Sequence, residues 1–329
     1  MMFGIGIIGA GSFGETHAKA IAQLSNAKLV ASSRTNAEAL ERFTQQWGGR
    51  GYVNYTELLN NRDVNVVVIA APHHLHTEMA EHAARAGKHI LLEKPMAPDL
   101  DGCDRILCAA KQANVALTVG FTSHFVRSYQ IAKQLLDAGE LGEVVLGIST
   151  MSKVWLDPNR RAWHLDRATG GGMWLTSGIH CLERLTWLID SPVEQVYAQL
   201  ATRFHDQPAD DIGLVSLKYA NGAMGAVVST GYRIGATKHL TELTCTKGTM
   251  NIDYAGGVTI GRDDKWQEIP DSGSPDWMHE AIVAEWRAFL DAIENNTAMP
   301  VTGEFGRAMM EVAFAAEESS RIGAAVRIS

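Results

Sequence analysis

Cysteine is scarce in this sequence, and its few residues lack the spacing of a metal site. The 329 residues include only four cysteines, and no two of them form a Cys-x-x-Cys pair. We therefore expect buried, reduced thiols in a cytosolic protein, with no zinc cluster and no disulfide framework. A chain of this length can bury a large hydrophobic core, so it requires neither kind of cross-link.

An excess of basic residues is also missing. The formal net charge is −8 and the isoelectric point is near 5.8. This balance argues against nucleic acid and anionic membranes as partners. The apolar opening run, residues 3–10, lacks the basic residues of a signal peptide and is much too short to span a membrane. We expect a cytoplasmic protein with neither a membrane nor a nucleic-acid partner.

The first 120 residues alternate two kinds of hydrophobic pattern. Short apolar runs predict strands at residues 5–9, 28–33, 64–71, 88–92 and 115–120. Helical patterns separate them at residues 14–24, 36–46, 77–86 and 98–114. Strands that alternate with helices of this length predict βαβ units and a parallel sheet.

The pattern changes after residue 121. Helices are predicted at residues 128–138, 175–189, 277–295 and 304–322, and several strands between residues 193 and 266. The pairs Asn221-Gly222 and Lys247-Gly248 are typical of hairpin turns. We therefore expect an α/β protein with a Rossmann dinucleotide-binding domain over residues 1–121. A C-terminal α/β domain with a large, open, mostly antiparallel sheet would follow over residues 122–329 and serve substrate binding and oligomerisation.

A glycine-rich turn links the first strand to the first helix. Gly9 permits the tight turn, Gly11 lets a pyrophosphate approach the backbone, and Gly14 lets helix and strand pack closely. Ser12 and Phe13 complete the turn, whose helix N-terminus favours an anion. The pattern predicts a nicotinamide dinucleotide cofactor.

The end of the second strand bears on the choice of cofactor. An acid that would bind the adenosine ribose is missing from residues 30–35, and the nearest acid is Glu38. Arg34 can instead bind a 2′-phosphate, with Ser33 and Thr35 as hydroxyl donors. NADP(H) is therefore favoured, and NAD(H) remains open if Arg34 is a solvated turn residue.

Several motifs along the chain fit one known family. They are residues 71–76, 93–95, 120–125, 139–143, 170–172 and 178–180. Together they resemble the Gfo/Idh/MocA oxidoreductases, named for glucose–fructose oxidoreductase and inositol dehydrogenase. The resemblance covers essentially the whole chain, and its most specific part is the Glu93-Lys94-Pro95 triplet.

The resemblance implies roles for individual residues. Lys94 becomes the catalytic lysine and His180 the catalytic histidine, while Glu93 shapes the nicotinamide pocket. The sequence departs from the family pattern at Thr176, where an Asp is usual, and at His124, where an Arg is common. Further candidates for cofactor contact are Ala71, Pro72, His73, His76, Lys94, Arg161 and Trp163.

The chemistry of the two catalytic candidates fits hydride transfer. Lys94 can polarise the oxygen on which charge develops, and His180 can move the proton near neutral pH. Aromatic, guanidinium and imidazole groups suit a polyhydroxy or carboxylated ring. The substrate-binding candidates are Lys94, His124, Trp155, Arg160, Trp163, Thr176 and His180. No metal site is expected, because the histidines at 73, 74 and 76 lack accompanying carboxylates.

The expected reaction is the reversible, NAD(P)-dependent oxidation of a secondary alcohol or hemiacetal to a carbonyl compound. A sugar, a sugar derivative or a cyclitol is the leading substrate class. An aromatic-catabolite semialdehyde or dihydrodiol is an alternative. A non-catalytic dinucleotide sensor is an alternative of another class, against which Lys94 and His180 argue. The resemblance also implies a homodimer or homotetramer.

Overall fold

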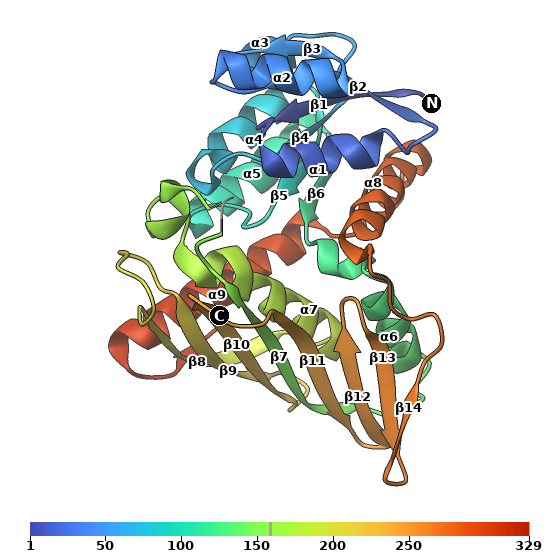
Figure 1. Ribbon diagram of the computed structural model, residues 1–329, viewed down its shortest axis with the longest axis vertical. Coiled ribbons are helices and arrows are strands. Elements are labelled where there is room, and N and C mark those ends of the chain that lie inside the picture. The colour runs from blue at the N-terminus through green and yellow to red at the C-terminus, as the bar shows by residue number, and fades with distance from the viewer. Residues whose placement is uncertain (158–159, 329) are drawn as a thin grey trace. The chain divides into compact units, whose positions relative to one another are not determined.

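The chain forms two compact units rather than two consecutive segments. The computed structural model describes residues 1–157 and 160–328, drawn in Figure 1. The first unit comprises Met1–Thr122 and His279–Arg307, and the second comprises Ser123–Met278 and Ala308–Ser329. This division differs from the contiguous domains expected over residues 1–121 and 122–329. The reason is helix α8 (Trp277–Asn295), whose apolar side chains join the core of the first unit.

The first unit is built on a parallel sheet, as predicted. Within the described residues its order is β3-β2-β1-β4-β5-β6, and every neighbouring pair is parallel. Its strands are β1 (Phe3–Ile8), β2 (Ala27–Ser33), β3 (Arg50–Tyr52), β4 (Val66–Ile69), β5 (His89–Glu93) and β6 (Leu117–Gly120). From β1 the strand order runs outward to β2 and β3 on one side, and from β4 to β5 and β6 on the other, so the order reverses between β1 and β4. Ligands of such sheets bind at the carboxyl ends of the strands near this point.

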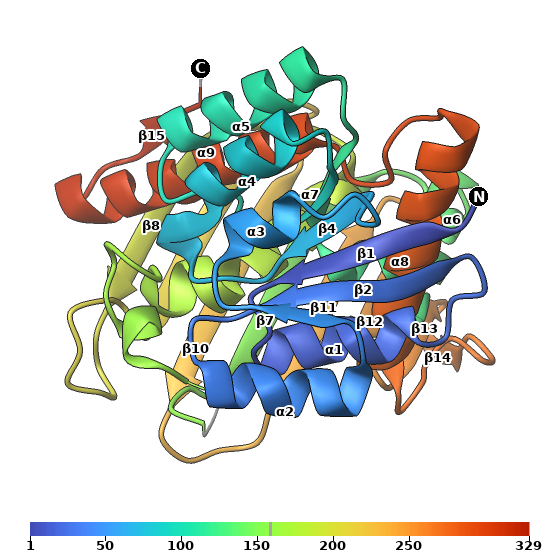
Figure 2. The same cartoon turned by 90° about the horizontal axis from the view of Figure 1, so that it is seen from above.

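Helices cover both faces of this sheet. Figure 2 shows α1 and α2 on one side of β1 and β4, and α4 and α5 on the other. The side chain of Asn36 accepts a hydrogen bond from Ala39 N at the start of α2, and Asp99 does the same for Gly102 at α5. The helices are α1 (Ser12–Ile21), α2 (Ala37–Trp47), α3 (Tyr55–Leu59), α4 (His76–Arg85) and α5 (Leu100–Ala113). Strand β3 and helix α3 have no counterpart among the ranges expected from the sequence.

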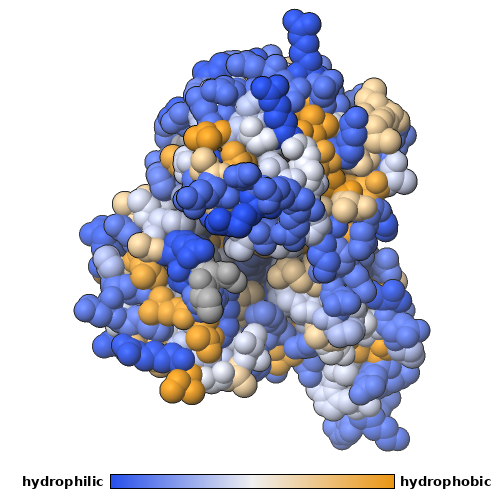
Figure 3. All heavy atoms as spheres, turned by 45° about the horizontal axis from the view of Figure 1, so that its top comes forward, coloured by the Kyte–Doolittle hydropathy of each residue, from blue (hydrophilic) through white to orange (hydrophobic). Residues whose placement is uncertain are grey.

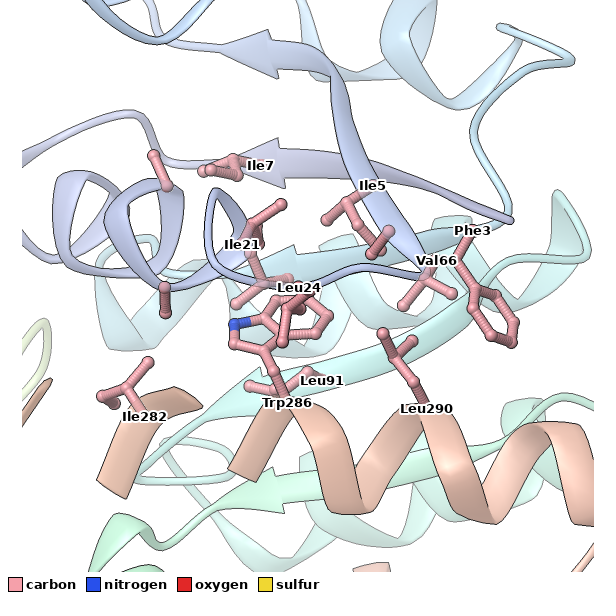
Figure 4. Close-up of a cluster of buried hydrophobic side chains, with 14 of the residues drawn as sticks. Phe3, Ile5, Ile7, Ile21, Leu24, Val66, Leu91, Ile282, Trp286 and Leu290 are labelled. Atoms are coloured by element: carbon pink, nitrogen blue, oxygen red, sulfur yellow. The ribbon is translucent and has the colours of Figure 1, made fainter. Parts of the chain in front are cut away.

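The core of the first unit joins segments far apart in the sequence. One face of β1 contributes Phe3, Ile5 and Ile7, and α8 contributes Trp286 and Phe289 to the same buried cluster. Figure 4 shows Trp286 and Leu290 of α8 projecting toward the side chains of β1, with Ile21 of α1 and Leu91 of β5 nearby. Helix α8 is therefore an integral part of the nucleotide-binding fold.

The second unit contains a large, mostly antiparallel sheet, which confirms the expected architecture. Its order among the described residues is β14-β13-β12-β11-β7-β10-β9-β8-β15, and Figure 1 shows most of these strands side by side. Strands β7 and β10 pair in parallel, and the other pairs are antiparallel. The strands are β7 (Val144–Val154), β8 (Val193–Ala201), β9 (Ile212–Tyr219), β10 (Met224–Tyr232), β11 (Lys238–Cys245), β12 (Gly248–Asp253), β13 (Gly257–Arg262), β14 (Lys265–Glu268) and β15 (Val326–Arg327). The sequence did not predict β7.

Helices pack on one face of this sheet. Helix α6 (Arg127–Asp137) packs on β12 and β13, and α7 (Ile179–Ile189) packs on β7 and β10. Helix α9 (Gly303–Ile322) accepts the indole N–H of Trp174 at Ala313 O. The outward side chains of β9 are exposed while the inward ones are buried.

The surface is that of a protein without a membrane segment among its described residues. None of the helices in residues 1–157 and 160–328 is both long enough and apolar enough to cross a bilayer. The face in Figure 3 is largely hydrophilic, with separate hydrophobic areas.

Candidate functional site

The glycine-rich turn after β1 leaves one position open. A Cβ atom at Gly9 would lie 2.3 Å from Ala70 O, and one at Gly14 would lie 2.5 Å from Gly9 O. At Gly11 a Cβ atom would have no neighbour within 4 Å. Gly11 is also the N-cap of α1, and its missing side chain leaves the helix end uncapped. These residues fit a dinucleotide, because a pyrophosphate can approach the backbone at Gly11 and accept from the free N–H groups of α1.

Arg34 lies against this turn. Its Nη1 donates to Ala10 O at 3.0 Å, and its backbone N–H donates to Tyr52 O at 3.2 Å. Ser33 is buried and its carbonyl accepts from the turn, whereas Thr35 is exposed. The guanidinium is thus held at the end of β2, beside the expected cofactor site, rather than extended into solvent.

His76 connects the loops that follow β4 and β5. Its Nε2 lies 2.9 Å from Ala71 O, and its Nδ1 lies 2.9 Å from Pro95 O. The ring is fully buried. Burial lowers the pKa of His76, while the two carbonyls and Glu93 act in the opposite direction. Pro72 caps the short turn His73–Leu75 before α4, and the ring of His73 meets that of His76 edge-on at 5.7 Å.

Glu93 and Lys94 stand at the carboxyl end of β5. Glu93 is its last residue, is buried, and accepts a hydrogen bond at Oε1 from His17 Nε2, 3.0 Å away. A Cβ atom at Gly120, on the neighbouring β6, would lie 2.9 Å from that same oxygen. Lys94 follows directly, and its charge contributes to lowering the pKa of His76. The structure therefore brings Lys94, Glu93 and His76 together in the first unit.

In the second unit, Thr176 and His180 lie at an irregular helix start. Residues Trp174–Gly178 form one π-helical turn, which leads directly into α7. Asp210 Oδ2 accepts from Trp174 N at 2.8 Å, and a Cβ atom at Gly172 would lie 2.6 Å from Asp210 Oδ1. Thr176 is buried in the turn, and His180 is half-buried in the first turn of α7. Such π turns occur frequently at functional sites.

His124 has a partner of its own in the same unit. Its Nε2 lies 2.9 Å from Glu183 Oε2, and both side chains are buried. Its ring stacks on Trp187 with centroids 4.1 Å apart. Glu183 follows His180 by about one turn of α7, so both side chains lie on the same face of that helix. A buried carboxylate is therefore present on this face, although position 176 holds no acid.

Two stacked pairs precede the glycine triplet at residues 170–172. The guanidinium of Arg160 lies 4.1 Å from the ring centroid of Trp155, and its Nε donates to Trp155 O. Trp155 is fully buried and donates from Nε1 to Gln207 Oε1 at 2.9 Å. Burial lowers the pKa of Arg160. Trp163 stacks on His164 at 3.6 Å, and the neighbouring Arg161 is exposed.

Some site residues were missed by sequence reasoning. His17 follows Gly14 by three positions, so helical spacing places both on one face of α1, which is a usable signal. Asp210 and Trp286 carry no local signal, because their contacts with Trp174 and His17 are distant in sequence. Among residues 1–157 and 160–328, no group of three or more His, Cys, Asp or Glu side chains is arranged to hold a metal ion.

Comparison with known proteins decides the family. Residues 3–121 match the family model described as an oxidoreductase family with an NAD-binding Rossmann fold, and residues 129–251 match the Gfo/Idh/MocA C-terminal domain. An uncharacterized oxidoreductase of Synechocystis, sll0816, is 30% identical over 281 residues, 78% of this chain and 74% of the relative. The chain belongs to the Gfo/Idh/MocA family.

Other members of the family match over their full length. The myo-inositol 2-dehydrogenase of Thermotoga maritima is 25% identical over 327 residues, 96% of this chain and 95% of the relative. The solved aldose-aldose oxidoreductase of Caulobacter crescentus, complexed with glycerol, has a TM-score of 0.89 at 25% identity and covers 100% of both chains. This Gfo/Idh/MocA protein is therefore an oxidoreductase that uses a nicotinamide dinucleotide, as the sequence predicted.

The open position at Gly11 generates a first prediction. In Gly11→Val, the dinucleotide affinity should fall more than tenfold, or about 1.4 kcal/mol, because the side chain occupies the path of the pyrophosphate. The protein should still fold, because a Cβ atom there meets nothing within 4 Å. Titration calorimetry with NADH and NADPH measures the affinity. Gly14→Ala is the contrasting variant. Its Cβ atom would meet Gly9 O, so the substitution should lower the melting temperature. Unchanged affinity in a folded Gly11→Val protein would remove the cofactor from this turn.

Asp210 generates a prediction on pH and stability. Burial raises its pKa from 3.8 to about 7, against the opposing effect of the Trp174 N–H. Between these values the folded protein binds more protons at this site than the unfolded chain, so the free energy of unfolding falls as pH rises. Asp210→Asn keeps an oxygen acceptor for Trp174 and removes the titration. Its stability relative to wild type should therefore grow from pH 4 to pH 7 and then level off.

Urea unfolding at several pH values measures this difference. The matched control is Asp206→Asn, because Asp206 is exposed four residues earlier. The control should show a difference from wild type that does not vary with pH. Parallel pH profiles for wild type and Asp210→Asn would contradict the prediction.

Proposed function

We propose that the protein reversibly oxidises a secondary alcohol or hemiacetal of a sugar, sugar derivative or cyclitol to the carbonyl compound. The observation that carries this proposal is the full-length likeness to a myo-inositol 2-dehydrogenase, 96% of this chain and 95% of that enzyme. The aldose-aldose oxidoreductase that shares the fold supports the same substrate class. Lys94 beside the buried Glu93 supports catalysis rather than a sensor role, because both end the strand at the ligand-binding edge of the sheet.

The residues of the first unit would hold the cofactor. The turn at Gly11 and the N-terminus of α1 would bind the pyrophosphate, and Arg34 would bind the adenosine end. A bound nicotinamide dinucleotide supplies the hydride acceptor for oxidation or the hydride donor for reduction. The ammonium of Lys94 would stabilise the negative charge that develops on the substrate oxygen.

His180 would move the proton. An imidazole exchanges protons near neutral pH, so it serves as a base in oxidation and as an acid in reduction. The hydroxyl of Thr176, four residues earlier, adds no negative charge next to it, and the nearby carboxylate of Glu183 is engaged by His124. We therefore expect substrates with a carboxylate or another acidic group to be accepted beside neutral ones. We assign direct substrate contact to Trp163, which is half-buried, in preference to Trp155 and His124, whose side chains are buried.

A substrate screen with two catalytic variants tests the function. Sugars, sugar acids and inositols are offered with NAD⁺ and NADP⁺, and absorbance of the reduced cofactor is followed. Lys94→Ala and His180→Ala should each lower kcat by roughly 10²-fold or more on the best substrate, since each removes charge stabilisation or proton transfer. Lys111→Ala, which changes an exposed lysine of α5, should retain wild-type rates. Near wild-type rates in both catalytic variants would refute their assigned roles. Tight dinucleotide binding without turnover of any compound would favour a sensor.

The cofactor preference has its own test. Because Arg34 is held at the end of β2 without an acid beside it, wild type should prefer NADPH to NADH in kcat/KM. Arg34→Ala should reduce that preference, since a charge-assisted hydrogen bond to phosphate contributes on the order of 1.5–3 kcal/mol. Arg42→Ala, an exposed arginine on α2, is the control. A wild-type preference for NADH would show that Arg34 takes no part in the choice.

A further inference from the structure

A chain of buried hydrogen bonds connects helix α8 to the end of β5. The indole Nε1 of Trp286 donates to His17 Nδ1 at 3.0 Å, and His17 Nε2 lies 3.0 Å from Glu93 Oε1. Trp286 and His17 are completely buried, and Glu93 is nearly so. The three residues come from α8, α1 and β5, all within the first unit.

The hydrogen bonds from Trp286 to His17 and from His17 to Glu93 determine which nitrogen of the His17 ring carries the proton. An indole N–H is only a donor, so the nitrogen that it contacts must carry a lone pair. Nδ1 of His17 is therefore unprotonated, and the proton of the neutral ring lies on Nε2. That N–H donates to the Glu93 carboxylate. A second proton on His17 would require the loss of the Trp286 bond.

Packing leaves these groups little freedom to reorient. The ring of His17 meets Phe13 edge-on at 5.2 Å and Trp286 edge-on at 5.9 Å. Figure 4 shows Trp286 projecting from α8 into the cluster that includes Ile21 and Leu24 of the α1 segment. Neighbouring groups therefore define the orientation of the His17 ring.

The neutral state of His17 has a consequence for the end of β5. A protonated His17 would pair with Glu93 and cancel its negative charge. A neutral His17 orients the carboxylate and leaves that charge in place. Lys94 follows Glu93 in the chain, and the charges of both act on the pKa of His76. Trp286 thus acts, through His17, on the carboxylate whose charge His76 experiences.

We propose that His17 and Trp286 are positioning residues of the active site. They hold the Glu93 carboxylate in one orientation at the end of β5, directly before Lys94, where the charges of both residues act on His76. The inference depends on the catalytic role of Lys94 proposed above. It assigns a function to a tryptophan that lies 192 positions after Lys94 in the chain.

Two kinds of role would predict the same hydrogen bonds. In a merely structural role, the chain satisfies buried polar groups, and its loss affects stability alone. In a positioning role, the identity of the donor to Glu93 and the tautomer of His17 affect the reaction as well. The following measurements separate the two.

The first measurement reports the tautomer without requiring activity. The protein is labelled with ¹⁵N-histidine, and His17 is assigned by its missing signals in His17→Gln. Two-bond ¹H–¹⁵N spectra of wild type at pH 7 should show an unprotonated Nδ1 and a protonated Nε2. In Trp286→Phe at the same pH, loss of the indole donor should let a proton appear on Nδ1. A protonated Nδ1 in wild type, or identical spectra in both proteins, would overturn the proposal.

The second measurement compares two replacements of His17. His17→Gln keeps an N–H donor near the position of Nε2, and His17→Leu removes it. On the best substrate, His17→Leu should lower kcat at least tenfold, since small displacements of catalytic groups cost one to two orders of magnitude. His17→Gln should recover to within about threefold of wild type, and KM should change little in either. If His17→Leu does not fold, Trp286→Phe carries the test through a kcat–pH profile with an added ionisation.

Leu290→Ala on α8 is the matched control. Leu290 is fully buried in the same core, and its truncation should lower the melting temperature without changing the kcat–pH profile. Equal kcat in His17→Leu and wild type would refute a positioning role. An altered profile in Leu290→Ala would show that any loss of packing produces the effect, which would also overturn the proposal. If no substrate is turned over at all, the proposed function fails, while the tautomer measurement still decides whether the chain exists.

Discussion

The arrangement of the first unit depends on one constraint, which is the parallel direction of its strands. A parallel sheet places all carboxyl ends at one edge, so the loops after β1, β2, β4 and β5 meet there although they are far apart in sequence. The polar contacts at this edge then fix the loops to one another. Arg34 binds the turn after β1, and His76 binds the loops after β4 and β5. The arrangement of the candidate site in this unit therefore follows from strand direction and from buried hydrogen bonding.

Burial of polar groups imposes a second constraint, because a buried donor or acceptor without a partner destabilises the fold. Glu93 and His76 satisfy it through partners from other elements, and Asp210 does the same in the second unit by accepting from Trp174 N. The contacts of Glu93 and His76 lie next to Lys94, to which we assign a role in the reaction. Because these buried hydrogen bonds also stabilise the fold, the stability of every variant must be measured with its rate.

Local patterns predicted most of the first unit and its candidate residues. The glycine turn, Arg34 and the Glu93-Lys94 pair follow strands that apolar runs identify, so sequence was sufficient to place them at one edge. Strand β7 was missed because a buried position in it is polar: Ser149 hydrogen-bonds Arg184 and Thr241 rather than packing against apolar side chains. The π turn at Thr176 was missed because it depends on Asp210, which approaches from a distant segment.

The assignment of α8 to the first unit shows why chain order is a poor guide to the site. Its hydrophobic pattern predicted a helix with the observed bounds, yet nothing in that pattern tells which sheet the helix covers. The burial of Trp286 against β1 and α1, together with its hydrogen bond to His17, places α8 on the sheet of the first unit. An apolar ring suffices for the packing, whereas the indole N–H also fixes the tautomer of the histidine. The choice of tryptophan at this position is therefore better explained by the end of β5 than by the core that surrounds it.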